Sequence, residues 1–349
     1  MYYPIKFKPV YKDYIWGGRY FEKFSRELPE GILAESWELS CHRNGVSVAA
    51  NGEQAGKTLP EIIKEDPGNI LGSKFPPDCG EIPLLVKFID ANDRLSVQVH
   101  PDDRYAAVYE GGLGKNEMWY ILDAQPGARI VAGLKPGVTR EVLAQAAENN
   151  RLEQCLLEIA VSPGDVINIP AGLIHAIGPG IVIAEIQQTS DITYRVFDYN
   201  RVDSKGESRP LHIEKALGVT DFNICGKEAK APGVKLQLNK DCTKTIFLAN
   251  RYFACERYDI DGSITEEADG SKFYILICLQ GQGTIRTGTV KEDIRQGETV
   301  LIPAAMGRYT LAGEFACLKA YIPDFRKDIV EPMRNAGCTD EEIFRVLNS

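Results

Sequence analysis

The sequence has only four histidines among 349 residues, and it has no excess of positive charge. Lys and Arg number 40 against 49 Asp and Glu, which gives a formal net charge of −9. This balance argues against wholesale binding to nucleic acid or to an anionic membrane. No apolar run approaches the roughly 18 residues of a membrane-spanning helix, and the start MYYPIKFKPV lacks the apolar core of a secretory signal. An anionic small substrate would therefore need a local cluster of Lys and Arg.

Cysteine is present but has no pattern of its own. The nine cysteines are scattered along the chain, are odd in number and include no CxxC pair. Such a distribution is typical of reduced, mostly buried thiols and predicts a cytoplasmic protein. A length of 349 residues with 44% hydrophobic content is sufficient for two domains with cores of their own.

Helical periodicity is sparse, and most of the chain alternates short apolar strands with turns rich in Gly, Pro, Asn and Asp. This pattern is typical of sandwiches and barrels. The clearest strands are PLLVKFIDA, LSVQVH, EMWYIL, GDVINIP, IVIAEIQQ and ITYRVFDY. Short helices are expected after Thr58 and Thr339, where a Glu three positions later completes a capping box, and at 139–150 and 211–217.

One stretch of sequence occurs twice. GDVINIPAGLIH (164–175) and GETVLIPAAMGR (297–308) both place Pro six positions after Gly, and the second copy ends in Arg where the first ends in His. Tyr-Ile-Leu precedes each copy, at 120–122 and 274–276. Glycine before a short apolar run that ends in Pro-Ala predicts a strand held between two turns. Two copies predict two copies of one β-barrel, and the second contains no histidine, so it cannot repeat a histidine metal site.

We therefore expect a mostly β protein with two jelly-roll barrels and a small helical portion. The first barrel, with its short helices, is expected over 1–230, a second, metal-free barrel over 231–325, and a helical segment over 326–349. The stretch 225–240 is rich in Lys, Gly and Pro and is our candidate for the linker.

Four polar residues have the spacing of ligands to one divalent metal ion. In LSVQVH the side chains of Gln98 and His100 point to the same face of a strand, one pleat repeat apart. Glu117 comes from a following strand, and His175 comes from a turn 58 positions further on. Two imidazoles, a carboxylate and an amide oxygen suit zinc or another borderline first-row ion. The set predicts a metalloenzyme with one ion per chain.

Several segments carry a family resemblance. Gly-x5-Pro-x-Gly-x2-His over 164–175 resembles the second cupin motif. Gln98-x-His100, followed by Glu117, resembles a first cupin motif whose leading His is replaced by Gln, as in type I phosphomannose isomerases (mannose-6-phosphate isomerases). Segments similar to this family follow in order: YIWGGRYFEKF, ESWELSCHRNG, PLLVKFIDANDRLSVQVHPDD, GKNEMWY and IAEIQQTSDITYRVFDYNR. The chain resembles the short bacterial form, which lacks a larger helical insertion.

The resemblance implies two cupin-like, double-stranded β-helix barrels and a zinc-dependent, reversible conversion of mannose 6-phosphate to fructose 6-phosphate. Such an isomerisation needs a base for the proton that moves between C1 and C2. Glu185 and Asp191 are the candidates, and the sequence does not decide between them. The resemblance places Arg195 in the active site, near the reacting carbons or the phosphate, where it would stabilise charge. Asp191 and Arg195 could instead form a structural salt bridge.

The phosphate of such a substrate needs cations despite the acidic composition. Lys87 lies on an alternating strand, Ser96 shares a strand face with two of the expected metal ligands, and Lys115 precedes Glu117 by two positions. These three are the expected substrate-binding residues. The expected partner is a sugar phosphate, with neither nucleic acid nor membrane, and the expected state is a monomer or a homodimer.

Two other functions fit parts of the pattern. A non-catalytic sugar-phosphate-binding protein with the same fold would lack a base or the active-site arginine, yet all of these residues are present. Another cupin metalloenzyme, such as an iron-dependent dioxygenase, would favour His over Gln98. His42 and His212 are expected to be structural hydrogen-bonding residues, and Trp16 and Trp37 are expected to pack in the core.

Overall fold

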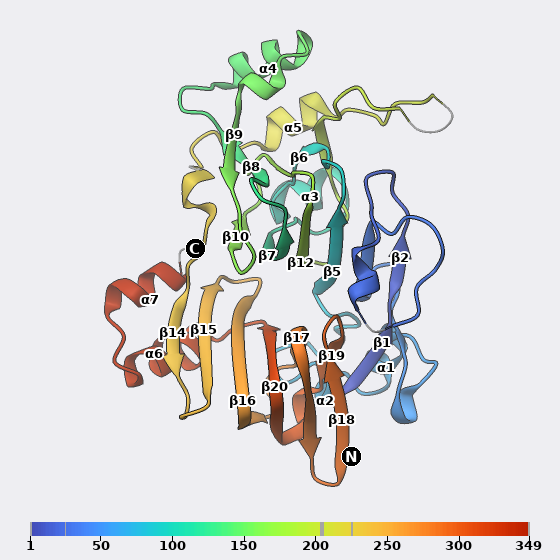
Figure 1. Ribbon diagram of the computed structural model, residues 1–349, viewed down its shortest axis with the longest axis vertical. Coiled ribbons are helices and arrows are strands. Elements are labelled where there is room, and N and C mark those ends of the chain that lie inside the picture. The colour runs from blue at the N-terminus through green and yellow to red at the C-terminus, as the bar shows by residue number, and fades with distance from the viewer. Residues whose placement is uncertain (1, 25, 203–205, 225, 348–349) are drawn as a thin grey trace.

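The computed structural model describes residues 2–24, 26–202, 206–224 and 226–347, and within them the fold is mostly β, as the sequence predicts. Figure 1 shows two layered units, one above the other. The upper, N-terminal unit has two sheets, and the lower, C-terminal unit is built on one larger sheet. The sheets have the jelly-roll character that the sequence predicts.

The N-terminal unit has two facing sheets. A six-stranded sheet runs in the order β10-β7-β12-β5-β3-β2, and a five-stranded sheet in the order β13-β6-β11-β8-β9. The strands are β2 (Val10–Lys12), β3 (Glu35–Leu39), β5 (Leu84–Ala91), β7 (Glu117–Ala124), β10 (Val166–Ile169) and β12 (Ile181–Gln188), then β6 (Val97–Val99), β8 (Arg129–Leu134), β9 (Leu156–Ala160), β11 (His175–Ile177) and β13 (Tyr194–Phe197). Ile89, Ile121 and Ile183 of the first sheet share an apolar core with Ile130 and Ile177 of the second.

The C-terminal unit is a nine-stranded sheet in the order β14-β15-β16-β20-β17-β19-β1-β4, with β18 paired to β17. The strands are β1 (Ile5–Lys8), β4 (Val48–Ala49), β14 (Val234–Gln237), β15 (Cys242–Ala249), β16 (Ala254–Ala268), β17 (Tyr274–Thr287), β18 (Val290–Arg295), β19 (Thr299–Ile302) and β20 (Gly307–Tyr321). Because β1 pairs with β19, the sheet of the second barrel includes strands from both ends of the chain.

The two units pack sheet on sheet through an apolar layer. Along β12, Ile183 faces the interior of the N-terminal unit, whereas Ala184 faces the C-terminal unit and shares a core with Ile275 and Leu318. All eight residues of β12 are buried because both faces of the strand are covered. Strand alternation then directs Glu185 into the interior of the N-terminal unit, on the same face as Ile183.

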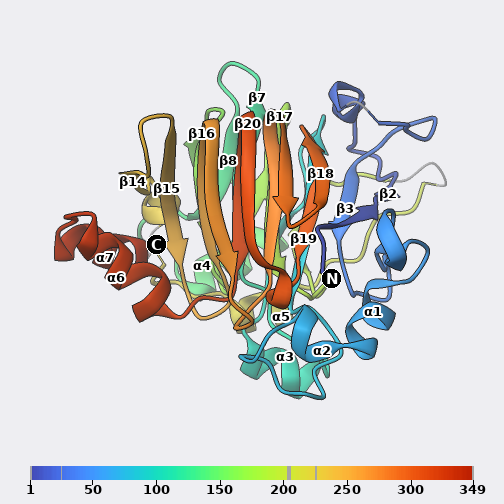
Figure 2. The ribbon, with the colours of Figure 1, turned by 90° about the horizontal axis from the view of Figure 1, so that it is seen from below.

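Within the described residues, seven short α-helices complete the fold. They are α1 (Leu59–Glu65), α2 (Pro67–Ile70), α3 (Asp103–Tyr109), α4 (Arg140–Glu148), α5 (Ile213–Val219), α6 (Glu331–Asn335) and α7 (Asp340–Leu347). Both predicted capping boxes form, at Thr58 and Thr339, and Thr139 caps α4. Figure 2 shows α6 and α7 beside the β14–β15 edge, and their Met333 and Ile343 join the core of the C-terminal unit.

Both units use the same strand order, which confirms the internal repeat. The order β10-β7-β12-β5-β3-β2 corresponds to β19-β17-β20-β16-β15-β14. The register corrects one detail, because Ile169 lies opposite Glu117, and its equivalent Ile302 lies opposite Tyr274. Tyr274 therefore corresponds to Glu117 and not to Tyr120, since the two Tyr-Ile-Leu tripeptides are three residues out of register.

The stretch 225–240 is not a free linker. In its described part, Ala231 N donates a hydrogen bond to Val166 O at 2.9 Å, and β14 pairs with β15. The stretch connects the two units and is packed against them, because the buried side chains of Ala231, Val234 and Leu236 belong to the two cores.

In the described part of the chain, no helix is long and apolar enough to cross a membrane. The eight cysteines that the structure describes are free thiols, and six of them are buried. The ninth, Cys225, lies outside the described residues.

Candidate metal centre and active site

Three of the four expected metal ligands converge inside the N-terminal unit. His100, Glu117 and His175 place one ligand atom each within 4.8 Å of one another. His100 Nε2 lies 3.2 Å from Glu117 Oε1, and His175 Nε2 lies 3.8 Å from Glu117 Oε2. His175 is the first residue of β11 rather than part of a turn, and it pairs directly with Gln98 of β6. The fourth expected ligand is thus adjacent, with Gln98 Nε2 3.3 Å from His175 Nε2.

The backbone fixes the orientation of both imidazoles. His100 Nδ1 is 2.8 Å from Ile192 O, and His175 Nδ1 is 2.8 Å from Leu173 O. A carbonyl partner makes Nδ1 the protonated nitrogen, which leaves each Nε2 unprotonated and able to act as a ligand atom beside Glu117. This is the arrangement that metal-ligating histidines adopt in proteins.

The charges of the cluster also suit a cation. Burial lowers the pKa of His175 to about 3 and also lowers the pKa of His100, so both rings are neutral at physiological pH. Burial would raise the pKa of Glu117, but the Lys115 ammonium and His100 hold that pKa well below its usual range. Neutral imidazoles and an ionised carboxylate are the protonation states that bind metal.

The residues therefore fit a divalent ion. All three side chains are buried, and the Lys115 ammonium contacts Glu117 Oε1 and lies 3.4 Å from His100 Nε2. Two of the three side chains thus already contact a positive charge. Rotation of the Gln98 amide about its last torsion presents its oxygen, a ligand atom, where its nitrogen now lies beside His175.

A cavity of about 630 Å³ opens beside this cluster. All six residues expected to act on the substrate line it, together with the ligand Gln98; the six are Lys87, Ser96, Lys115, Glu185, Asp191 and Arg195. The sequence therefore predicted residues that the fold brings to one place, although the six residues lie on six different strands and loops.

Glu185 and Asp191 differ sharply in their surroundings. Glu185 is 3% exposed, and burial and then the charge of Glu117 raise its pKa to about 6. The indole of Trp119 donates to Glu185 Oε2 at 3.0 Å and to Glu117 Oε2 at 3.2 Å, so it links the carboxylate to the metal cluster. The Asp191 side chain is 43% exposed and accepts a hydrogen bond from Asn44 at 2.6 Å.

Arg195 contacts neutral groups. Its Nε lies 3.3 Å from Ser96 Oγ, and its Nη1 donates to Pro210 O at 3.0 Å. Within the described residues it forms no ion pair, so the alternative of a structural salt bridge with Asp191 is wrong. Arg209 lies close enough to lower the pKa of Arg195, after the larger effect of burial, and pairs with Asp198 at 2.6 Å. This end of the cavity is therefore cationic.

Sequence reasoning missed one wall of the cavity. Lys12, Glu35 and Trp37, from β2 and β3, line it together with Asn44. Trp37 is only 4% exposed, and Trp16, 3% exposed, also lines the cavity, so both tryptophans combine core packing with a place at the site. The pairing of β3 with β5 is what brings this wall into position.

His212 and Arg209 complete the lining at the cationic end. His212 was expected to be structural, and its Nδ1 does accept a hydrogen bond from the Arg195 backbone at 3.2 Å. Neither residue carries a local sequence signal, because both reach the cavity through contacts with distant residues, His212 with the Arg195 backbone and Arg209 with Asp198.

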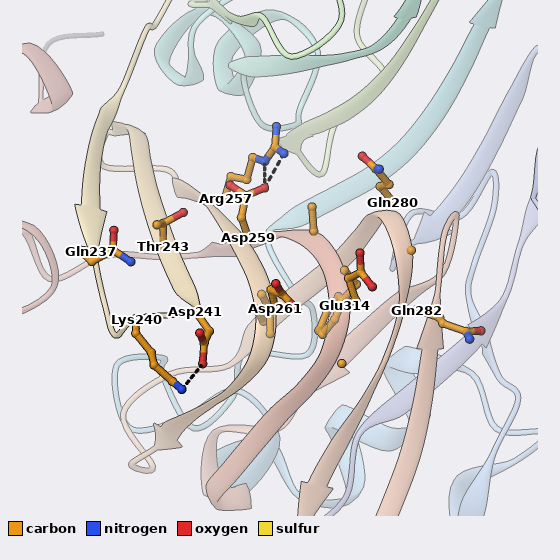
Figure 3. Close-up of a pocket in the computed structure, with 15 residues that line it drawn as sticks. Gln237, Lys240, Asp241, Thr243, Arg257, Asp259, Asp261, Gln280, Gln282 and Glu314 are labelled. Carbon is orange, nitrogen blue, oxygen red and sulfur yellow. Dashed lines mark hydrogen bonds and ion pairs between the residues drawn. The ribbon is translucent and has the colours of Figure 1, made fainter.

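A larger cavity, about 790 Å³, lies on the C-terminal unit (Figure 3). Its carboxylates are Asp241, Asp259, Asp261 and Glu314, and two of them are already neutralised by ion pairs, Asp241 by Lys240 at 3.7 Å and Asp259 by its neighbour Arg257. The described side chains around it include no group of potential metal ligands. Among the described residues, the group of potential metal ligands lies beside the smaller cavity.

Comparison with known proteins agrees with this geometry. Residues 5–126 match the family model of the phosphomannose isomerase type I catalytic domain, and residues 243–322 match the mannose-6-phosphate isomerase cupin domain. The mannose-6-phosphate isomerase ManA of Bacillus subtilis is 34% identical over 323 residues, which cover 91% of this chain and 99% of that protein. The chain belongs to the type I phosphomannose isomerase family. A mannose-6-phosphate isomerase of Streptococcus mutans is 37% identical over 88% of this chain and 94% of its own length.

Solved structures of the family show the same fold. The crystal structure of the mannose 6-phosphate isomerase from Bacillus subtilis superposes with a TM-score of 0.83 at 32% identity, covering 91% of this chain and 99% of that one. A variant of phosphomannose isomerase from Salmonella typhimurium, only 16% identical, superposes with a TM-score of 0.76 over the same shares. The fold has therefore persisted through extensive change in sequence.

Proposed function

We propose that this protein is a zinc-dependent isomerase that interconverts mannose 6-phosphate and fructose 6-phosphate. The observation that supports it best is one cavity that joins a neutral-imidazole metal cluster, a buried carboxylate of raised pKa and a cationic end. Those are the three parts that the reaction needs: a Lewis acid, a base for a C–H proton and a phosphate site.

Glu185 is our candidate for the acid–base group. Its carboxylate is held by Trp119 at 3.0 Å and by Lys87 at 3.4 Å, and it faces the cavity from a strand that is buried on both sides. A carboxylate with a pKa near 6 accepts a carbon-bound proton and returns it to the neighbouring carbon more readily than a solvated one. Burial and rigidity favour Glu185 over Asp191.

Gln98, His100, Glu117 and His175 would hold the ion. Zinc fits two imidazoles, one carboxylate and one amide oxygen. When bound, it supplies positive charge next to the sugar oxygens on which negative charge develops. Lys115, in contact with Glu117, would add a second positive charge at this end of the cavity.

The phosphate would lie at the other end. Arg195 and Ser96 are in contact there, and Arg209 is the next cation. The nearby carboxylate, Asp198, accepts hydrogen bonds from both Arg209 and Arg201. It therefore does not neutralise Arg195 and Arg209 together, and a net positive charge is left for a dianion. Lys87 and Lys115 form ion pairs with Glu185 and Glu117, so they remain substrate-binding candidates that would contact the sugar rather than the phosphate.

The direct test is a coupled assay for fructose 6-phosphate formed from mannose 6-phosphate. Activity that disappears on chelation and returns with zinc would support both the reaction and the ion. A folded, zinc-loaded protein without activity would contradict the proposal and would favour a sugar-phosphate-binding protein.

Glu185→Gln should lower kcat about 100- to 10,000-fold, because the variant keeps the shape of the side chain but loses the base. Steady-state kinetics on the zinc-loaded protein would measure it. Asp191→Asn is the matched control, and we expect its kcat to fall by less than about tenfold. The reverse ranking of the two variants would assign the base to Asp191.

Arg195→Ala should raise KM about 10- to 100-fold while the metal content stays at that of the native protein, because the variant removes a charged hydrogen-bond donor from the phosphate end. Kinetics and metal analysis on the same sample give both quantities. A large fall in kcat at unchanged KM would instead place Arg195 beside the reacting carbons.

A further inference from the structure

The register of the two units aligns three charged positions. In the N-terminal unit, Glu185 of β12 lies opposite Lys87 of β5, and Lys87 lies opposite Trp37 of β3. In the C-terminal unit, Lys319 of β20 lies opposite Glu256 of β16. The pairings of β7 and β17 align the two units. Glu185 lies opposite Trp119, two residues after Glu117, and Lys319 lies opposite Leu276, two residues after the equivalent Tyr274.

The third position follows from the outer strand. Glu256 lies opposite Ile246 of β15, so Ile246 corresponds to Trp37. Two residues earlier on each strand are Lys244 and Glu35, respectively. The corresponding positions therefore carry opposite charges throughout. The N-terminal triad is Glu35, Lys87 and Glu185, and the C-terminal triad is Lys244, Glu256 and Lys319.

In both triads the outer residue contacts the middle one. Lys87 Nζ lies 3.8 Å from Glu35 Oε2 and 3.4 Å from Glu185 Oε1. Lys244 Nζ lies 3.4 Å from Glu256 Oε1. The outer side chains are also similarly buried, with 12% of Glu35 and 14% of Lys244 exposed. The C-terminal unit has this contact with the charges inverted, although its described residues include no metal-ligand cluster, so the contact does not require a metal site.

Glu35 is itself held rigidly. The indole N–H of Trp37 donates to Glu35 Oε2 at 2.7 Å, and the Lys87 ammonium lies 4.9 Å from the centroid of the same indole. A lysine ammonium moves on a flexible four-carbon stem, so a second carboxylate and an aromatic face restrict where it rests. Without Glu35, the ammonium would keep one carboxylate partner, Glu185, and the face of the Trp37 indole.

We propose that Glu35 is a positioning residue that fixes the Lys87 ammonium against Glu185. This proposal rests on the proposed function, because it assigns Glu35 a role at Glu185, the acid–base group of that site. Glu35 does not need to touch the substrate. It sets the distance and direction from which Lys87 meets Glu185.

The test compares Glu35→Gln with Lys244→Met, which removes the outer charge of the equivalent triad in the other unit. Glu35→Gln should lower kcat about tenfold with KM changed less than about twofold. Lys244→Met should leave both constants unchanged, although both variants lose a partly buried ion pair and should lose similar thermal stability. An unchanged kcat in Glu35→Gln would overturn the proposal, as would equal losses in both variants.

A double-mutant cycle with Lys87→Met separates positioning from a structural role. If Glu35 acts through Lys87, Glu35→Gln should have less than a twofold effect on kcat in the Lys87→Met background. The same tenfold loss in both backgrounds would overturn the proposal. The native protein is assayed in parallel, so an inactive native protein would contradict the proposed function, whereas an active one with an unaffected Glu35→Gln variant would contradict only the role of Glu35.

Discussion

Replacement of His100 with alanine should remove the metal ion and the isomerase activity together. His100 supplies one of three converging ligand atoms, its Nε2, because its Nδ1 is held by Ile192 O. Alanine has no atom that can replace this ligand. We expect metal content to fall below about a tenth of an ion per chain, and kcat to fall at least about 1000-fold, since the Lewis acid is lost. Metal analysis after gel filtration, with kinetics on the same sample, measures both.

His42→Ala is the matched control for metal binding. His42 lies outside the cluster, with its Nε2 3.5 Å from Asp191, and this variant should retain the full metal content. Full metal content in His100→Ala would show that His100 is not a ligand. Loss of activity with retained metal would instead assign His100 to the chemistry rather than to the ion.

Local sequence periodicity predicts part of the metal cluster, and the motif resemblance predicts the rest. Alternation along LSVQVH places Gln98 and His100 on one face, and this holds although β6 spans only Val97–Val99. The strand pairings add Glu117 and His175, and each lies at the start of its strand. Helix starts were equally predictable, because a capping box is a contact between residues three positions apart.

The far wall of the cavity was not predictable in this way. Glu35 and Lys87 are 52 positions apart, and they meet only because β3 pairs with β5. The choice between Glu185 and Asp191 was also beyond the sequence, because it depends on burial by a second sheet and not on neighbours in the chain. Both failures concern contacts between distant segments, which a local pattern does not encode.

The inverted triads were hidden for a related reason. Pro170 and Pro303 are 133 positions apart, Glu117 and Tyr274 are 157 apart, and the equivalents Lys87 and Glu256 are 169 apart. Loops of different length thus change the number of positions between equivalent residues from strand to strand. The repeated tripeptide Tyr-Ile-Leu is itself out of register between the two units. Only the pairing registers show which positions correspond.

The interior of the C-terminal unit contains a buried cation, Lys319, that contacts both a carboxylate and an aromatic ring. Lys319 is 4% exposed, it forms an ion pair with Glu266, and its ammonium lies 4.2 Å from the centroid of the Tyr274 ring. Burial would lower the pKa of Lys319, but Glu266 and its other neighbours raise it well above its usual value. Tyr274 occupies the position that corresponds to Glu117. The C-terminal unit therefore has the Lys319 ammonium over the Tyr274 ring at the place where the N-terminal unit has the expected metal ligand Glu117.

Lys319→Met should therefore be the most destabilising single change in the C-terminal unit. It leaves Glu266 without its partner in a mostly buried site, which costs about 3 to 5 kcal/mol and lowers the unfolding midpoint by roughly 5 to 10 °C. Calorimetry on the metal-loaded protein measures the shift. Lys57→Met, which breaks the exposed Lys57–Glu65 pair, should move the midpoint by less than about 2 °C. Adding Glu266→Gln to Lys319→Met should recover part of the lost stability, because the unpaired carboxylate is then removed. A double variant less stable than Lys319→Met would show that the Lys319–Glu266 pair does not stabilise this interior.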